Sequence, residues 1–134
     1  MVLILDLQRA THATLHRLAA HLGDLGLPPS ELNALANLGE RPGGASTVSE
    51  LATAIGGRPT TLTGILDRLQ QRGLLAREPH PRDRRTVIVR LTPDGVDAAE
   101  RVLAAMRELE RRALADLPPD AADSAAAVLR ALSQ

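Results

Sequence analysis

The stretch that decides the fold is residues 47–73, TVSELATAIGGRPTTLTGILDRLQQRG. Thr47 and Glu50 have the spacing of a capping box, in which each side chain binds a free backbone amide at a helix start. Gly56-Gly57 predicts the end of this helix, because glycine tolerates the left-handed conformation that follows a helix C-terminus. Pro59 suits the first position of a second helix. The stretch therefore predicts two short helices joined by a glycine turn.

The second helix has one apolar face and one polar face. Leu62, Ile65, Leu66 and Leu69 recur at helical spacing. A helix-turn-helix can place its second helix in the DNA major groove, where small residues let the backbone approach base edges. An ordinary solvated helix face is the alternative for the polar side. The residues of this motif that we expect at DNA are Thr47, Arg58, Thr60, Thr61, Thr63, Gly64 and Arg68.

A hairpin is predicted directly after these helices, with strands at 74–78 and 86–91. The segment between them, PHPRDRR at 79–85, is too long and too charged for a two-residue turn and should protrude. Arginine is attracted to the negative potential of the minor groove, so the tip favours a DNA probe over a merely solvated loop. The tip residues that we expect at DNA are Arg82, Asp83, Arg84 and Arg85.

These residues together resemble the MarR family of winged-helix transcriptional regulators. The resemblance rests on Leu51-Ala52, LTGILDRL at 62–69, RGL at 72–74, DRR at 83–85 and VRLTPDG at 89–95. It implies that Arg85 enters the minor groove and that Asp83 orients it, and we expect the Asp83 carboxylate to pair with the Arg85 guanidinium. The family usually caps its recognition helix with serine or threonine. This chain has Arg58 there, so either Gly57 is the cap or the helix start is held less firmly.

Composition limits the classes of function. The 134 residues contain no phenylalanine, tyrosine, tryptophan or cysteine. A core of leucine, valine, isoleucine and alanine favours helix, and single-stranded nucleic-acid platforms that stack bases on aromatic rings are excluded. Disulfides and thiol chemistry are excluded as well. No catalytic motif is present, so we expect no enzyme, no metal site and no cofactor.

Charge is distributed unevenly along the chain although the formal net charge is zero. Residues 56–92 contain eight arginines and three acidic residues, whereas the remainder contains eight arginines and thirteen acidic residues. A basic segment with a local charge of +5 can neutralise DNA phosphates even in a neutral protein. This pattern favours a DNA-facing module on an acidic scaffold.

The flanking sequence predicts further helices at about 4–22, from Pro28-Pro29 onward, from Thr92 to about 115, and at about 120–132. Residues 39–45 are expected to form a connector. Terminal helices this rich in leucine, together with the resemblance, predict a two-fold homodimer. The residues that we expect at the dimer interface are Leu7, Leu103, Leu109 and Leu129, and those that we expect to face inward from the last helix are Ala122, Ala125, Val128, Leu129 and Leu132.

The expected fold is mainly α with a small β-hairpin wing, as one domain over 1–134: a winged helix-turn-helix at 27–92 and dimerisation helices at 1–24 and 93–134. The apolar run at 1–5 is short and lacks a basic leader, so we expect a cytoplasmic protein with no signal peptide and no membrane contact. The resemblance implies a small-molecule effector, for which His12, His16 and Arg17 are the candidate residues.

The function expected from these observations is a homodimeric, sequence-specific regulator of transcription, a repressor, on a palindromic double-stranded operator. The alternative is a winged helix used for protein–protein interaction, or a regulator controlled by a protein partner.

Overall fold

The computed structural model describes residues 1–56 and 58–134 of the chain. Its helices are α1 (Leu3–His21), α2 (Pro29–Gly39), α3 (Val48–Ile55), α4 (Pro59–Gln71), α5 (Pro93–Leu114) and α6 (Ala121–Leu132). Its strands are β1 (Ala45–Thr47), β2 (Leu75–Pro79) and β3 (Val87–Leu91), and single 3-10 turns lie at Gly23–Leu25 and Pro42–Gly44. The predicted class, mainly helical with a small wing, is confirmed. The described helices include none with the length and apolar character needed to span a membrane.

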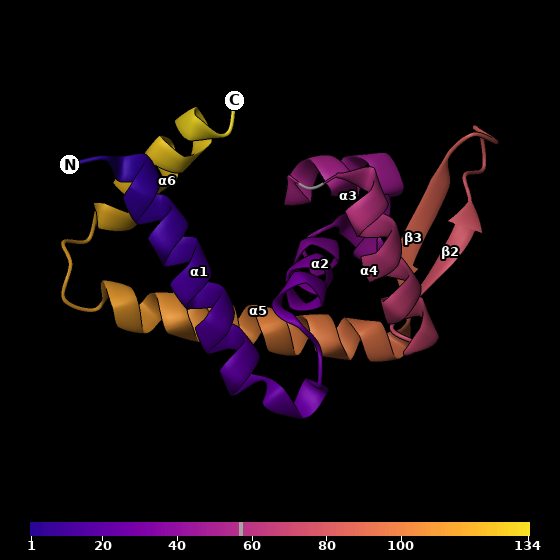
Figure 1. Ribbon diagram of the computed structural model, residues 1–134, viewed down its shortest axis with the longest axis horizontal. Helices are drawn as coiled ribbons and strands as arrows, with labels where there is room; N and C mark the ends of the chain where they lie inside the picture. Colours follow the sequence, from indigo (N-terminus) through magenta and orange to yellow (C-terminus); the bar gives the residue numbers. More distant parts are fainter. Residues whose placement is uncertain (57) are drawn as a thin grey trace.

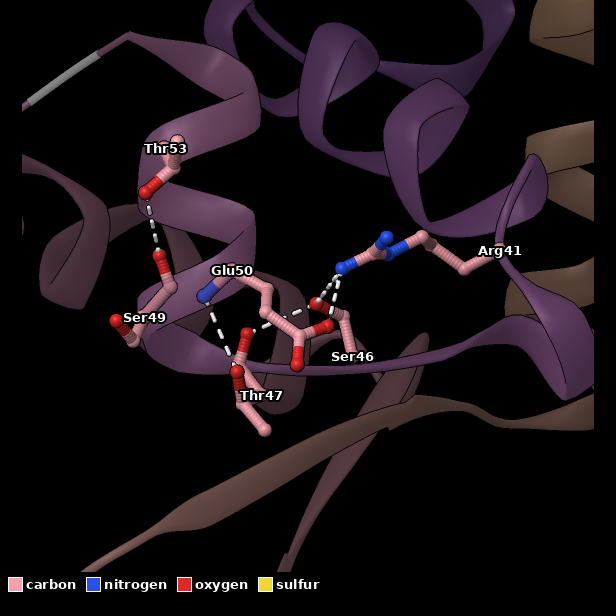
Figure 2. A network of polar contacts seen from close by, with 6 residues as sticks. All are labelled: Arg41, Ser46, Thr47, Ser49, Glu50 and Thr53. Atoms are coloured by element: carbon pink, nitrogen blue, oxygen red, sulfur yellow. Dashed lines mark hydrogen bonds and ion pairs between the residues drawn. The ribbon is translucent and has the colours of Figure 1, made fainter.

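Both ends of α3, the first helix of the helix-turn-helix, form as predicted. Thr47 caps α3 by accepting a hydrogen bond from the Glu50 amide at 3.1 Å. Gly56 ends α3 in the left-handed region, with φ of 73°. The prediction that the Glu50 side chain would also bind a backbone amide at the helix start is wrong, because its carboxylate instead binds Arg41 in the loop after α2 (Figure 2). Gly57, the alternative cap of α4, lies outside the described residues.

The sheet has three strands where a two-stranded hairpin was predicted. The strand order is β1-β3-β2 and both pairs are antiparallel, with Ser46 and Arg77 on either side of Val89. The third strand, β1, runs from the last residue of the expected connector to the cap of α3. Its residues are small, and it pairs because the chain enters α3 alongside β3. Residues 80–86 form the tip of the wing, which projects away from the helices (Figure 1).

The core lies around α2, which is packed between α5 on one side and α3 and α4 on the other (Figure 1). The apolar face predicted for α4 is confirmed, since all four of its residues are at most 4% exposed. Other side chains that are fully buried in this core are Leu32, Leu35, Leu38, Leu51, Leu75, Val89 and Val102. No aromatic ring is needed because leucine fills the space between layers.

The junction between the wing and α5 explains the motif LTPDG at residues 91–95. The Thr92 hydroxyl accepts from the Gly95 amide at 3.1 Å, which caps α5, and donates to the Gly73 carbonyl at 2.6 Å. A Cβ on Gly95 would lie 1.8 Å from the Leu74 carbonyl oxygen. Only glycine therefore fits at position 95, and this contact fixes the start of α5 against the end of α4.

The terminal helices have the predicted bounds within one or two residues, but not all of the predicted burial. None of the residues predicted to face inward from α6 is buried, and Val128, Leu129 and Leu132 are 42–46% exposed. At the other end of the chain, Leu18 of α1 and its C-cap Leu22 are buried in the chain's own core.

Candidate nucleic-acid interface

The arginines of the basic segment divide into two groups. Within residues 1–56 and 58–134, four of them are bonded to other parts of the chain. These are Arg68 with Glu31, Arg72 with the carbonyls of Leu25 and Gly26, Arg77 with Asp67 and Gln70, and Arg90 with Glu78 and the Gly43 carbonyl. Their guanidinium groups hold the module together.

The other four arginines are Arg58, Arg82, Arg84 and Arg85. In the part of the chain that the structure describes, their side chains make no hydrogen bond or ion pair, and all four residues are exposed. Arg58 precedes α4, and the other three lie at the wing tip. The wing tip and the N-terminal end of α4 extend toward the same edge of the molecule (Figure 1). The cations free to bind an external anion are therefore concentrated at this edge.

Two side chains shape the wing tip. The His80 Nδ1 accepts from the backbone amides of Arg82 and Asp83, each at 3.1 Å. The Asp83 carboxylate accepts from the Arg85 amide and from the Thr86 hydroxyl, both at 3.0 Å. These bonds, first that from the Arg85 amide and then that from Thr86, lower the pKa of Asp83. The carboxylate is therefore charged at neutral pH.

This geometry corrects the expected role of Asp83. The predicted pair between its carboxylate and the Arg85 guanidinium is not among the contacts of the described residues, in which the two carboxylate oxygens bind the Arg85 amide and the Thr86 hydroxyl. Asp83 instead fixes the backbone from which Arg85 projects. The role of His80 was missed by sequence reasoning, although its place at the start of the tip was visible.

The polar face of α4 carries the exposed residues Thr60, Thr61 and Thr63. Gly64 has a structural role within the chain. A Cβ at this position would lie 3.2 Å from the Arg68 Nη1, so the missing side chain makes room for that guanidinium. The Arg68 Nε lies 3.4 Å from the Oε1 of Glu31.

Thr47 at the start of α3 was also predicted to contact DNA. Its hydroxyl already caps α3. Figure 2 shows the network around it, in which Arg41 reaches both Ser46 and Glu50 from the loop after α2. The network fixes the start of α3. A hollow of about 700 Å³ lies between α3 and the wing, lined by Val48, Ser49, Ala52, Thr53, Gly56, Arg85, Thr86 and Val87. Arg85 and the exposed hydroxyls of α3 therefore face one space.

The predicted dimer residues have different surroundings. Leu103 is 7% exposed and packs in the chain's own core beneath Gly39, so it needs no second chain for burial. Leu129 is 46% exposed on α6. Leu7 and Leu109 are half-buried.

Hollows lie along α1 and α5, and two of them bear on the predicted effector site. One, of about 220 Å³, is lined by Arg17, Leu18, His21, Ala105, Glu108, Leu109 and Arg112. The other, of about 420 Å³, is lined by Thr11, Thr14, Leu15, Leu18, Asn33, Met106, Leu109, Glu110 and Ala113. Of the three candidate effector residues, only Arg17 lines either hollow. His12 and His16 stack with ring centroids 4.3 Å apart, and in the described chain no third metal-binding side chain joins them.

Comparisons with known proteins agree with this geometry. Residues 25–86 match the model of the MarR family. The chain is 33% identical over 109 residues to the HTH-type transcriptional repressor MdtR of Bacillus subtilis, which covers 81% of this chain and 69% of that protein. It spans about half the length of three other curated relatives, of which two are named HTH-type transcriptional repressors.

Solved structures show the same fold. A probable transcriptional regulator from Pseudomonas aeruginosa is 32% identical, covers 96% of both chains and has a TM-score of 0.74. A MarR family transcriptional regulator from Streptomyces coelicolor, solved in complex with DNA, is 25% identical with a TM-score of 0.79 and covers 98% of this chain and 84% of that one. These relatives are transcriptional regulators and not enzymes. The protein belongs to the MarR family of winged-helix, DNA-binding transcriptional regulators.

Proposed function

We propose that the protein is a homodimeric, sequence-specific repressor that binds a palindromic operator in double-stranded DNA and responds to a small organic effector. The observation that supports DNA binding most directly is the location of the uncommitted arginines. They lie at the start of α4 and at the wing tip, whereas the arginines elsewhere in the basic segment are bonded within the chain.

The two elements have different roles in this proposal. Thr60, Thr61, Thr63 and Gly64 on α4 lie in the major groove, where hydroxyl groups and a threonine methyl can discriminate base edges. The arginines contact phosphates and the minor groove, which positions the protein on the duplex. Arg68 and Thr47 are less available than expected, because one is paired with Glu31 and the other caps α3.

The dimer is supported by the apolar residues that one chain leaves exposed. On α6 these are Val128, Leu129 and Leu132, and before and within α1 they are Val2, Leu3, Ile4 and Leu5. Exposed apolar surface gathered on two helices is typical of an association site. A two-fold dimer presents two copies of α4 and reads two half-sites about one helical turn apart.

The effector site is the larger hollow between α1, α2 and α5. Its lining is mainly apolar with a few polar groups from Thr11, Thr14, Asn33 and Glu110, which suits a small organic molecule. NadR, whose fold this chain shares with a TM-score of 0.88 at 22% identity, was solved with 4-hydroxyphenylacetate. Arg17 is close to this region and provides a cation for an acidic effector, whereas His12 and His16 do not line the hollow.

The test is binding to the duplex that flanks the protein's own gene, compared with a random duplex of the same length at one salt concentration. Arg85→Ala should weaken operator binding by about 1–3 kcal/mol. Arg107→Ala is the charge-matched control, because Arg107 lies on α5 and is paired with Glu100. It should change operator binding little.

Salt dependence tests the same surface. If each half of the dimer neutralises roughly three to five phosphates, the slope of log K against log salt should be on the order of −5 to −9. A flat slope, or equal effects of the two arginine variants, would contradict a DNA-facing wing. The alternative of a protein-binding wing has less support, since its tip presents arginines and lacks apolar anchors.

A further inference from the structure

The wing tip is closed by a titratable residue. The His80 amide donates to the Thr86 carbonyl at 3.2 Å, and the Thr86 amide donates to the Asp83 carbonyl at 3.1 Å. The Nδ1 of the same residue accepts from the Arg82 and Asp83 amides at 3.1 Å. An imidazole nitrogen accepts only when it carries no proton, so these bonds require neutral His80 with its hydrogen on Nε2.

We propose that His80 is a positioning residue for DNA recognition: its neutral imidazole holds the tip in the shape that presents Arg85 to the minor groove, and protonation releases that shape. The inference rests on the proposed function. It concerns how strongly the protein prefers its operator over other DNA.

Charged groups around His80 act in both directions on the protonated imidazole. The Asp83 carboxylate favours it, and Glu78 is two residues earlier on β2 but is paired with Arg90. The three tip arginines disfavour it. The decisive step is the loss of the Nδ1 acceptor, which leaves two tip amides without their partner. The second organiser, Asp83, then holds only the far side of the tip through the Arg85 amide and Thr86.

Protonation also adds a positive charge next to DNA, which strengthens binding to any duplex. The ratio of operator affinity to random-duplex affinity distinguishes the effect of the added charge from the effect of the lost tip shape. Added charge raises both affinities alike, whereas a disordered tip lowers only the part of operator binding that depends on Arg85 geometry. The ratio therefore reports the positioning role.

The experiment compares the wild-type protein with His80→Asn and His80→Ala at about pH 7.5 and about pH 5.5, an interval in which histidine ordinarily titrates. Asparagine offers an acceptor oxygen to the same amides and does not titrate. Both variants keep His12, His16 and His21, so they control for the other histidines. Circular dichroism at each pH checks that the helices remain folded.

The wild-type ratio should fall about five- to tenfold on acidification, as expected for the loss of two hydrogen bonds. At both pH values, the ratio for His80→Asn should stay near the wild-type ratio measured at the higher pH. The ratio for His80→Ala should be low at both pH values. In the free wild-type protein, the amide resonances of Arg82 and Asp83 should shift together with the His80 ring.

A wild-type ratio that is independent of pH, or a ratio for His80→Asn that falls in parallel with the wild type, would overturn the inference while leaving the proposed function intact. Equal binding of operator and random duplex by the wild-type protein at high pH would instead refute the proposed function, and this inference with it.

Discussion

The winged module and the terminal helices differ in how far the chain buries their apolar faces. In the module, the apolar face of α4 is at most 4% exposed and meets α2 from the same chain. On α6, the corresponding leucines are 44–46% exposed. Both helices are amphipathic, yet only one finds its complement within the chain. A helical pattern in the sequence thus predicts an apolar face without saying whether the chain itself buries that face.

The two regions are nevertheless connected by arginines. Arg72, at the end of α4, binds the carbonyls of Leu25 and Gly26 in the segment that follows α1. Arg101 on α5 binds Asp24 in that same segment at 2.7 Å. The position of the recognition helix is therefore tied to the end of α1, and a change along α1 and α5 has a direct physical route to α4.

The largest expected effect is on the core of the module. Leu69→Ala should lower the free energy of unfolding by about 2–5 kcal/mol, because Leu69 is fully buried and its removal leaves a cavity. Urea denaturation measures this loss. Leu132→Ala on α6 is the matched control, and its smaller effect should depend on protein concentration. An equal, concentration-independent loss at Leu132 would show that α6 belongs to the chain's own core.

A charge on α6 should separate association from folding. In the proposed dimer, Leu129→Asp should weaken association by about 2 kcal/mol, because it would place an unpaired carboxylate in the proposed interface. Sedimentation equilibrium measures the dissociation constant, and circular dichroism should show unchanged helix content. A dimer of wild-type strength would place the interface elsewhere.

The parts of the fold that local patterns encode were predictable. The leucine spacing of α4, the Thr47 and Thr92 caps and the glycine stop at Gly56 all depend on neighbours within one or two helical turns. Strand β1 was not predictable, because three small residues become a strand only when β3 is alongside.

The candidate site was predictable in outline, as a polar helix face and an arginine-rich tip. The state of each arginine was not. Arg72 binds carbonyls that are 46 and 47 residues away, and Arg68 meets a glutamate on α2. Eight arginines look alike in the sequence, and only the fold distinguishes those that hold the module from those that are free to bind.

The connection through Arg72 should have a moderate and local effect. Arg72→Ala removes the two bonds to the carbonyls of Leu25 and Gly26, for an expected loss of about 1 kcal/mol. Hydrogen exchange should accelerate at residues 23–27 while the Leu69 amide stays protected. Arg84→Ala, an exposed arginine at the wing tip, is the control and should leave exchange in both places unchanged. Uniform acceleration after Arg72→Ala would mean that the bonds support the whole module.

The smallest expected effect is at the far end of α5, where Glu108 binds Arg111 and Arg112 at 2.7–2.9 Å. Bonds from Arg111, and then from Arg112, lower the pKa of Glu108 from 4.5 to about 2. Because the folded pKa is the lower one, the stabilisation is complete above the unfolded value and is lost as pH falls from 4.5 toward 2. Glu108→Gln should flatten that part of the stability profile.

The expected change in stability at this end of α5 is much smaller than that expected in the core of the winged module. The three side chains are well exposed, so water screens their attraction and the contribution to stability should be small. Urea midpoints for wild type and Glu108→Gln, compared between about pH 5 and about pH 2.5, measure this contribution. If both proteins lose stability equally across the range, acid sensitivity originates in carboxylates elsewhere, and the end of α5 depends for its stability on apolar contacts instead of this charge cluster.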